Sequence, residues 1–156
     1  MKEFPKKTDT ELIMERFFSI NLDLLCIADL DGNFIKLNKS WESLLGYSTE
    51  ELQKKNFLEF VHTDDLENTK MAMQELGEDK QVLNFINRYR CKDNSYRYIE
   101  WRSQPYDGLI YAAARDITDK LQIQAIIEEK EKNFRIFFET MDDLIFVVAE
   151  NGLILH

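Results

Sequence analysis

Residues 111–120 read YAAARDITDK, and this stretch decides how the chain is organised. Its first residues are apolar and mostly small, as suits a strand that packs closely against its neighbours. Asp116 and Asp119 then place acidic side chains where a helix would begin, at the positive end of its dipole. The stretch predicts that the last strand of a domain runs into a connecting helix over residues 117–140. Such a junction suits the passage of a structural change along the chain.

Composition predicts a globular domain and limits its partners. The chain has 156 residues, 44% of them hydrophobic, which is enough for one core and an appendage. A net charge of -9 argues against binding to nucleic acid or to an anionic membrane. Cys26 and Cys91 lack metal-knuckle or disulfide-framework spacing, and residues 1–4 do not start a signal peptide. We expect a cytoplasmic protein without membrane insertion.

The pattern before the junction predicts an α+β domain. A capping box at residues 8–11 starts an amphipathic N-terminal helix, assigned to residues 1–20. A hairpin with an Asp-Gly turn follows, and then two short helices and a longer helix that ends at Gly77. Three strand-length segments complete the domain, at residues 82–91, 96–104 and 109–115. This order predicts an antiparallel sheet with helices between its second and third strands.

The predicted connecting helix carries a seam of mostly apolar residues at alternating spacings of four and three. Such a seam is typical of a helix that pairs with another helix, and it favours a homodimer. An amphipathic helix that lies on its own domain would give nearly the same pattern. The seam consists of Ile123, Ile127, Lys130, Phe134, Phe137 and Met141.

An internal repeat predicts that a second copy of the domain starts at residue 141. The pair Phe17-Phe18 recurs as 137–138, residues 23–25 recur as 143–145, and Asp31-Gly32 recurs as Asn151-Gly152, all at one offset. Residues 141–156 would thus hold the first strand and turn of a truncated second domain. Because an isolated hairpin is marginally stable, we expect this apolar tail to be covered, preferably by a partner chain.

Seven stretches, in order along the chain, resemble a PAS domain with its C-terminal PAC segment. The resemblance covers about residues 17–120, with the PAS/PAC domain itself assigned to residues 21–116. Thr63 and Asn94 depart from the residues that are common in this family, but each suits a turn. The stretches are residues 23–29 (DLLCIAD), 31–34 (DGNF), 37–42 (LNKSWE), 45–48 (LGYS), 60–65 (FVHTDD), 88–93 (RYRCKD) and 115–118 (RDIT).

The resemblance implies a five-stranded antiparallel sheet with short helices on one face, around a pocket that holds a cofactor or small ligand in some members. It also implies that strand movements reach the output through the junction formed by Arg115, Asp116, Ile117 and Thr118. The reactive Asn-Cys-Arg motif of the flavin-binding photoreceptors is absent. His62 lies where the family has a structural histidine, so no haem ligand is expected. No cofactor is predicted, and an unidentified small ligand stays open.

Alternation along the predicted strands suggests which residues line that pocket. Phe85, Asn87 and Tyr89 share one face of a strand. If that face and the face of the next strand that carries Ser103 both point into the core, Asn87 and Ser103 are polar groups on an apolar wall. They would need a protein group, a water or a ligand as partner, and internal pairing is favoured. The candidate pocket residues are Cys26, Asn38, Trp41, Phe57, Phe60, Asn87, Tyr89, Trp101, Ser103 and Ala112.

The function favoured by these patterns is sensing and relay. The sequence contains no phosphate-binding glycine loop, no zinc-protease motif and no nucleophile elbow, so we expect no catalysis by this chain itself. The first hypothesis is a sensory module of a multidomain signalling protein, such as a sensor histidine kinase, that binds a small ligand or relays a conformational change. The alternative is a dimerisation or relay module without a ligand, in a diguanylate cyclase or another regulator.

Overall fold

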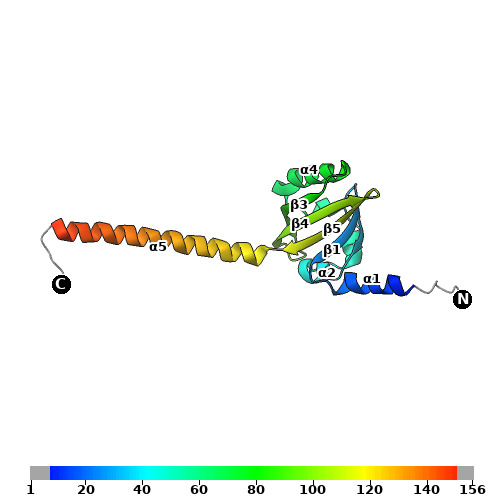
Figure 1. The fold of residues 1–156 in the computed structure, drawn as a ribbon, viewed down its shortest axis with the longest axis horizontal. Helices are drawn as coiled ribbons and strands as arrows, with labels where there is room; N and C mark the ends of the chain where they lie inside the picture. The colour runs from blue at the N-terminus through cyan, green and yellow to red at the C-terminus, as the bar shows by residue number, and fades with distance from the viewer. Residues whose placement is uncertain (1–7, 151–156) are drawn as a thin grey trace. The chain divides into compact units, whose positions relative to one another are not determined.

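The computed structural model describes residues 8–150, and it contains one five-stranded sheet. All neighbouring strands are antiparallel, in the order β2-β1-β5-β4-β3 (Figure 1). The α+β class and the antiparallel five-stranded sheet that the sequence predicts are confirmed. The strands are β1 (Leu24–Asp29), β2 (Phe34–Leu37), β3 (Val82–Arg90), β4 (Tyr96–Tyr106) and β5 (Leu109–Asp116).

Helices precede the sheet, connect its strands and follow it. Each of α1, α3 and η1 begins with a capping box, in which a side chain at the helix start and a glutamate exchange hydrogen bonds with the backbone. The helices are α1 (Asp9–Ile20), α2 (Ser40–Leu45), α3 (Thr49–Gln53), η1 (Phe57–Phe60), η2 (Thr63–Asp65), α4 (Leu66–Gly77) and α5 (Thr118–Glu150).

The β1–β2 hairpin is held by its glycine and by Asn56. Gly32 has a φ of 95°, in the left-handed region that favours glycine. A Cβ atom there would lie 2.7 Å from Oδ1 of Asn56, whose Nδ2 donates to the carbonyl of Asp31 at 2.7 Å. Asn56 also caps η1, so one side chain joins the hairpin turn to the helical segment.

The hairpin between β4 and β5 is tighter than the sequence suggested. Residues 105–108 were expected to form the turn, but β4 continues through Pro105, which pairs with Ile110 of β5. The paired part of β3 ends opposite Ser103, so no β3 backbone group needs the N–H that proline lacks. Only Asp107 and Gly108 turn the chain, both with positive φ, as a two-residue hairpin loop requires.

The core lies between the inner face of the sheet and the helical segment from α2 to α4. Trp41, Leu52 and Ile99 are fully buried there. The predicted alternation is confirmed on both strands: Asn87 and Tyr89 of β3 are buried, as are Ile99, Trp101 and Ser103 of β4. A bulge at Asn84, with a φ of 55°, shifts the register of β3. Val82 and Phe85 therefore both reach the inner face.

The chain divides into two compact units, one ending at Ile117 and the other starting at Thr118. The second unit contains α5, which continues to Glu150. The first strand of the second copy, expected within residues 141–156, is not observed in residues 141–150, which are helical. The helix satisfies the backbone groups of this segment locally. The assignment of residues 141–156 to a second domain stays a prediction, and residues 151–156 lie outside the described residues.

Candidate functional site

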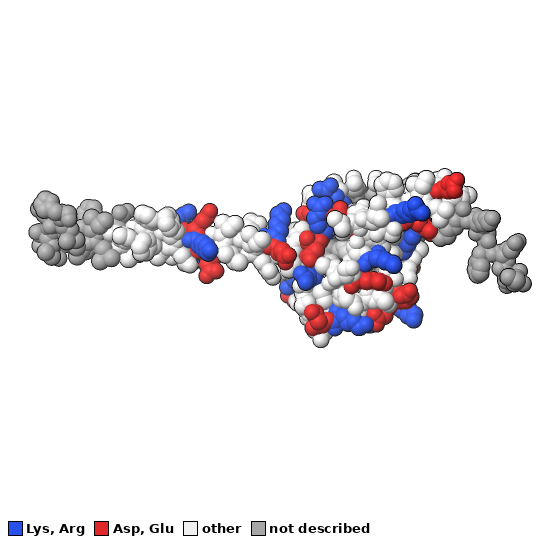
Figure 2. Space-filling view, turned by 90° about the horizontal axis from the view of Figure 1, so that it is seen from below, with Lys and Arg blue, Asp and Glu red and all other residues white. Residues whose placement is uncertain are grey.

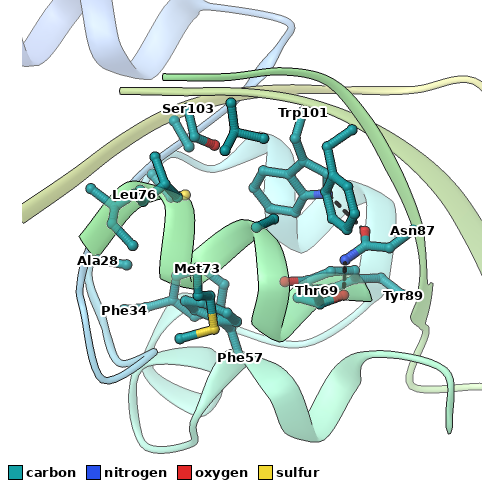
Figure 3. A pocket seen from close by; sticks show the side chains of 16 residues that line it. Ala28, Phe34, Phe57, Thr69, Met73, Leu76, Asn87, Tyr89, Trp101 and Ser103 are labelled. Atoms are coloured by element: carbon teal, nitrogen blue, oxygen red, sulfur yellow. Dashed lines mark hydrogen bonds between the residues drawn. The ribbon is translucent and has the colours of Figure 1, made fainter. Parts of the chain in front are cut away.

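A cavity of about 50 Å³ lies between the inner face of the sheet and α4. Figure 3 shows side chains of α4 facing those of β4 across this space. Its surroundings are mainly aliphatic and aromatic, with a few hydroxyl, amide and thiol groups. The lining residues are Cys26, Ala28, Phe34, Phe57, Thr69, Ala72, Met73, Leu76, Val82, Phe85, Asn87, Tyr89, Trp101, Ser103, Ile110 and Ala112.

The cavity exists because one row across the sheet carries small side chains. Strand register places Val82 opposite Ser103, Ser103 opposite Ala112, and Ala112 opposite Cys26. These four positions belong to four different strands, so along the whole row the side chains project only a short distance from the sheet. Protein interiors are otherwise packed to the density of organic crystals, and this row leaves room that the side chains of α4 do not fill.

A chain of hydrogen bonds crosses one wall of the cavity. The Thr69 hydroxyl donates to the carbonyl of Asp65 at 2.7 Å and accepts from Nδ2 of Asn87 at 3.1 Å. Nε1 of Trp101 donates to Oδ1 of Asn87 at 2.7 Å (Figure 3). The internal pairing favoured for Asn87 is therefore observed. These bonds connect α4, β3 and β4 at the site.

An ion pair anchors the first turn of α4 next to this chain. Nη2 of Arg88 lies 2.7 Å from Oδ1 of Asp65, while Nε and the backbone N–H of Arg88 both donate to Oδ2 at 2.8 Å. The hydrogen bond from the Arg88 side chain holds the pKa of Asp65 below its ordinary value, and the same contact raises the pKa of Arg88. Because both groups are partly buried, the geometry constrains how α4 covers the cavity.

Two hydroxyls in the lining differ from the other buried polar groups. Every fully enclosed side-chain nitrogen or oxygen in the described residues has a hydrogen-bond partner. The hydroxyls of Tyr89 and Ser103 form no hydrogen bond with a described residue, although the two side chains are only 2% and 6% exposed. They therefore border open space, and both lie in the lining of the cavity (Figure 3).

The cavity is electrically neutral. Its lining contains no aspartate, glutamate, lysine, arginine or histidine. Burial raises the pKa of the Cys26 thiol to about 12. Burial, with a smaller contribution from Cys26, holds the pKa of the Tyr89 phenol well above its ordinary value. Both groups are thus protonated near neutral pH, and the site has no ionised group of its own.

Seven of the ten candidate pocket residues lie in the lining, and three do not. Asn38 instead accepts from the N–H of Leu25 at 3.1 Å and donates to the carbonyl of Asp23 at 2.9 Å. Trp41 donates to the carbonyl of Leu25, and Phe60 packs edge-on against Tyr47. Those three residues are buried beside the cavity, where Trp41 packs against the rings of Tyr89 and Trp101. The seven lining residues are Cys26, Phe57, Asn87, Tyr89, Trp101, Ser103 and Ala112.

Sequence reasoning missed the side of the cavity formed by α4. Thr69, Ala72, Met73 and Leu76 lie at relative spacings of three, four and seven along that helix. This is the signature of one helix face, and it was available in the sequence. The sequence did not show that this face packs against the sheet, because periodicity indicates that a helix face is buried without showing what covers it.

The predicted relay residues are tied to the start of β1 and to β4. Arg115 forms an ion pair with Asp23, with Nε 3.1 Å from Oδ1, and Asp116 lies 3.6 Å from Arg97. Ile117 is buried and its N–H donates to the carbonyl of Tyr98 at 2.9 Å. Thr118 begins α5.

His62 has the structural position predicted for it. Its Nδ1 accepts from the N–H of Asp64 at 3.2 Å, which caps η2, and its ring packs edge-on against Tyr96. It does not line the cavity. Within the described part of the chain, no group of three or more histidine, cysteine or acidic side chains is arranged to hold a metal ion.

The charge distribution offers no broad basic area on the face seen in Figure 2, where basic and acidic side chains are interspersed. Charged side chains of the domain also form close pairs, such as Lys92 with Glu51 at 2.9 Å. Among the helices described between residues 8 and 150, none has the length and apolar character needed to cross a bilayer.

The chain is similar to known signalling proteins. A family model described as "PAS fold" matches residues 34–110. Sporulation kinase E of Bacillus subtilis is 26% identical over 159 aligned residues, which cover 92% of this chain and 21% of that kinase. The chain therefore spans about a fifth of that relative's length.

Solved structures share the fold. The PAS domain of an HTR-like protein from Haloarcula marismortui has a TM-score of 0.62 and 23% identity, covering 70% of this chain and 98% of that one. A domain of a sensor histidine kinase/response regulator from Geobacter sulfurreducens has a TM-score of 0.60 and 15% identity, covering 69% of this chain and 94% of that one. The PAS-fold family model thus matches residues 34–110, and these structures show that the chain has the PAS fold.

Proposed function

We propose that this chain is the sensory module of a multidomain signal-transduction protein of the sensor histidine kinase type. The observation that carries the proposal is the link between sensor and output helix: a single residue, Ile117, separates β5 from α5. The similarity to Sporulation kinase E over 92% of the chain supports the same assignment. A C-terminal PAC segment and a second domain from residue 141 belong to this proposal.

The sensing step would take place in the cavity. Strand β5 contributes Ile110 and Ala112 to its lining and continues through Asp116 toward α5. A ligand that shifts the sheet there would displace the strand that leads into the helix. Signals can pass only if the ligand binds one arrangement of the sheet better than another, since equal affinity for both changes no population.

The junction provides the test. In a protein that joins this chain to a histidine kinase output domain, we expect Asp116→Ala to make autophosphorylation constitutive or silent. The substitution removes the ion pair with Arg97 and a predicted helix cap worth roughly 0.5 to 2 kcal/mol. Glu50→Ala, which removes an acidic side chain from the first turn of α3, serves as the control and should leave regulation intact. Regulated phosphorylation in the Asp116 variant would refute the relay.

The second candidate is a dimerising relay without a ligand. It is favoured by the apolar seam of α5, on which Ile123, Ile127, Phe134 and Phe137 are each at least 50% exposed. We expect a homodimer formed through α5 and the tail. Light scattering of the intact chain and of a chain ending at Lys120 tests this: equal association of the two would show that neither segment makes the dimer.

A further inference from the structure

We propose that the cavity binds a small neutral molecule carrying a hydroxyl or carbonyl group, and that Tyr89 Oη and Ser103 Oγ recognise it. This inference rests on the proposed sensing function and adds to it the chemical class of the ligand and the atoms that select it.

The two unpaired hydroxyls point to a polar ligand. Each can donate one hydrogen bond and accept others, and neither has a partner among the described residues. Three other polar side chains of the wall are already engaged, since Thr69 and Asn87 bond to each other and Trp101 bonds to Asn87. The Cys26 thiol is only a weak hydrogen-bonding group. Recognition therefore falls to Tyr89 and Ser103.

The lining also excludes ionised ligands. It contains no charged residue, so an ion would lose its hydration without gaining an opposite charge. The other surfaces are aliphatic and aromatic, such as Phe57, Met73 and Leu76, and suit a hydrocarbon body. A neutral molecule with one polar end and a hydrocarbon body matches both the two hydroxyls and the apolar lining.

The volume limits the size of the ligand. The cavity measures about 50 Å³, and one water-sized sphere takes roughly 10 to 15 Å³ of such a volume. The space corresponds to a ligand of about three to five non-hydrogen atoms. Short-chain alcohols, ketones and diols fall in this class, whereas flavin, haem and nucleotides are far larger than the space.

The experiment uses the purified chain with 2-propanol, acetone and acetate, which have equal numbers of non-hydrogen atoms. The methyl groups of Ala28, Ala72, Met73 and Ala112 line the cavity and report binding by NMR. We expect 2-propanol and acetone to shift these signals saturably and acetate to leave them unchanged. Saturable shifts of the same methyls by acetate at equal affinity would overturn the inference, as would no shift by any probe.

Two variants test the recognising atoms. Tyr89→Phe and Ser103→Ala each remove one hydroxyl, and we expect each to weaken binding of 2-propanol by about tenfold. Tyr106→Phe and Ser43→Ala make the same changes at exposed positions outside the cavity and should bind as the wild type does. Wild-type affinity in both cavity variants would contradict the assignment.

These outcomes are separate from those of the proposed function. Binding of neutral probes to the isolated chain does not depend on any output domain, so it can succeed when the Asp116→Ala experiment fails. Conversely, relay through the junction can hold with an empty cavity, in which case the NMR experiment alone fails.

Discussion

Two buried polar regions face the same side of the sheet, and they differ in how their hydrogen-bonding groups are used. The Asn38 side chain makes hydrogen bonds to backbone groups of Asn21, Asp23 and Leu25, which joins the link between β2 and α2 to the start of β1. In the cavity, the hydroxyls of Tyr89 and Ser103 make none with described residues.

The difference separates structural polar groups from recognition groups. A buried amide that is fully paired stabilises one arrangement of the backbone, and its loss leaves partners without hydrogen bonds. A hydroxyl that borders a cavity and has no protein partner adds no hydrogen bond to the fold. Such a group is available to a ligand, and removing it should not harm the fold.

The largest effect is expected at Asn38. Asn38→Leu removes the hydrogen-bond partner of the Leu25 N–H and of the Asp23 carbonyl, whereas the Asn21 carbonyl still accepts from the Ser40 hydroxyl. Each buried group left unpaired costs roughly 1 to 3 kcal/mol. We expect the free energy of unfolding to fall by about 3 kcal/mol, measured by urea unfolding followed by circular dichroism.

Asn68→Leu provides the matched control, because Asn68 is exposed on α4. Its effect should stay within about 0.5 kcal/mol. An equal loss in both variants would show that the Asn38 hydrogen bonds do not stabilise the domain.

An intermediate effect is expected at Asp65, and it should depend on pH. Asp65→Asn removes the charge that pairs with Arg88 and should cost about 1.5 to 3 kcal/mol at pH 7. The pKa of Asp65 is lowered in the folded protein, so its contribution is present above the unfolded value of 3.8 and is lost as pH falls through the lower folded value.

Urea unfolding of both proteins between pH 7 and pH 2 measures this dependence. The difference between wild type and Asp65→Asn should be constant near neutrality and shrink below about pH 3.8. Glu67→Gln, at an exposed pair with Lys70, should change stability by less than about 1 kcal/mol. A difference that grows toward low pH would be inconsistent with a stabilising Asp65 carboxylate.

The smallest effect is expected at Tyr89. Tyr89→Phe keeps the ring contacts with Trp41 and Trp101, and removes an oxygen that has no described partner. We expect a stability within about 0.5 kcal/mol of wild type, or a slight gain. Thermal unfolding checks this, and a loss above about 1 kcal/mol would place the Tyr89 hydroxyl with Asn38 among the structural groups.

Much of the fold could be predicted from local patterns. The capping boxes at Thr8 and Ser48, the Asp-Gly turn and the alternation along β3 and β4 each depend on a few neighbouring residues. The β4–β5 turn was predicted too long because Pro105 normally interrupts a strand. The proline is tolerated in β4 because β3 stops pairing with β4 at Ser103, and where that pairing stops is a property of the sheet.

The sequence by itself determined the α+β class, the order of the strands along the chain, and that Asn87 and Tyr89 share one face of their strand. Period-two alternation and capping act between residues that are close along the chain, so they can be read without a structure. Only the tertiary structure decided that Asn87 is paired while the Tyr89 and Ser103 hydroxyls are not. That outcome depends on the register of four strands and on the position of α4 above them, which bring together residues as distant in sequence as Cys26, Thr69 and Ala112.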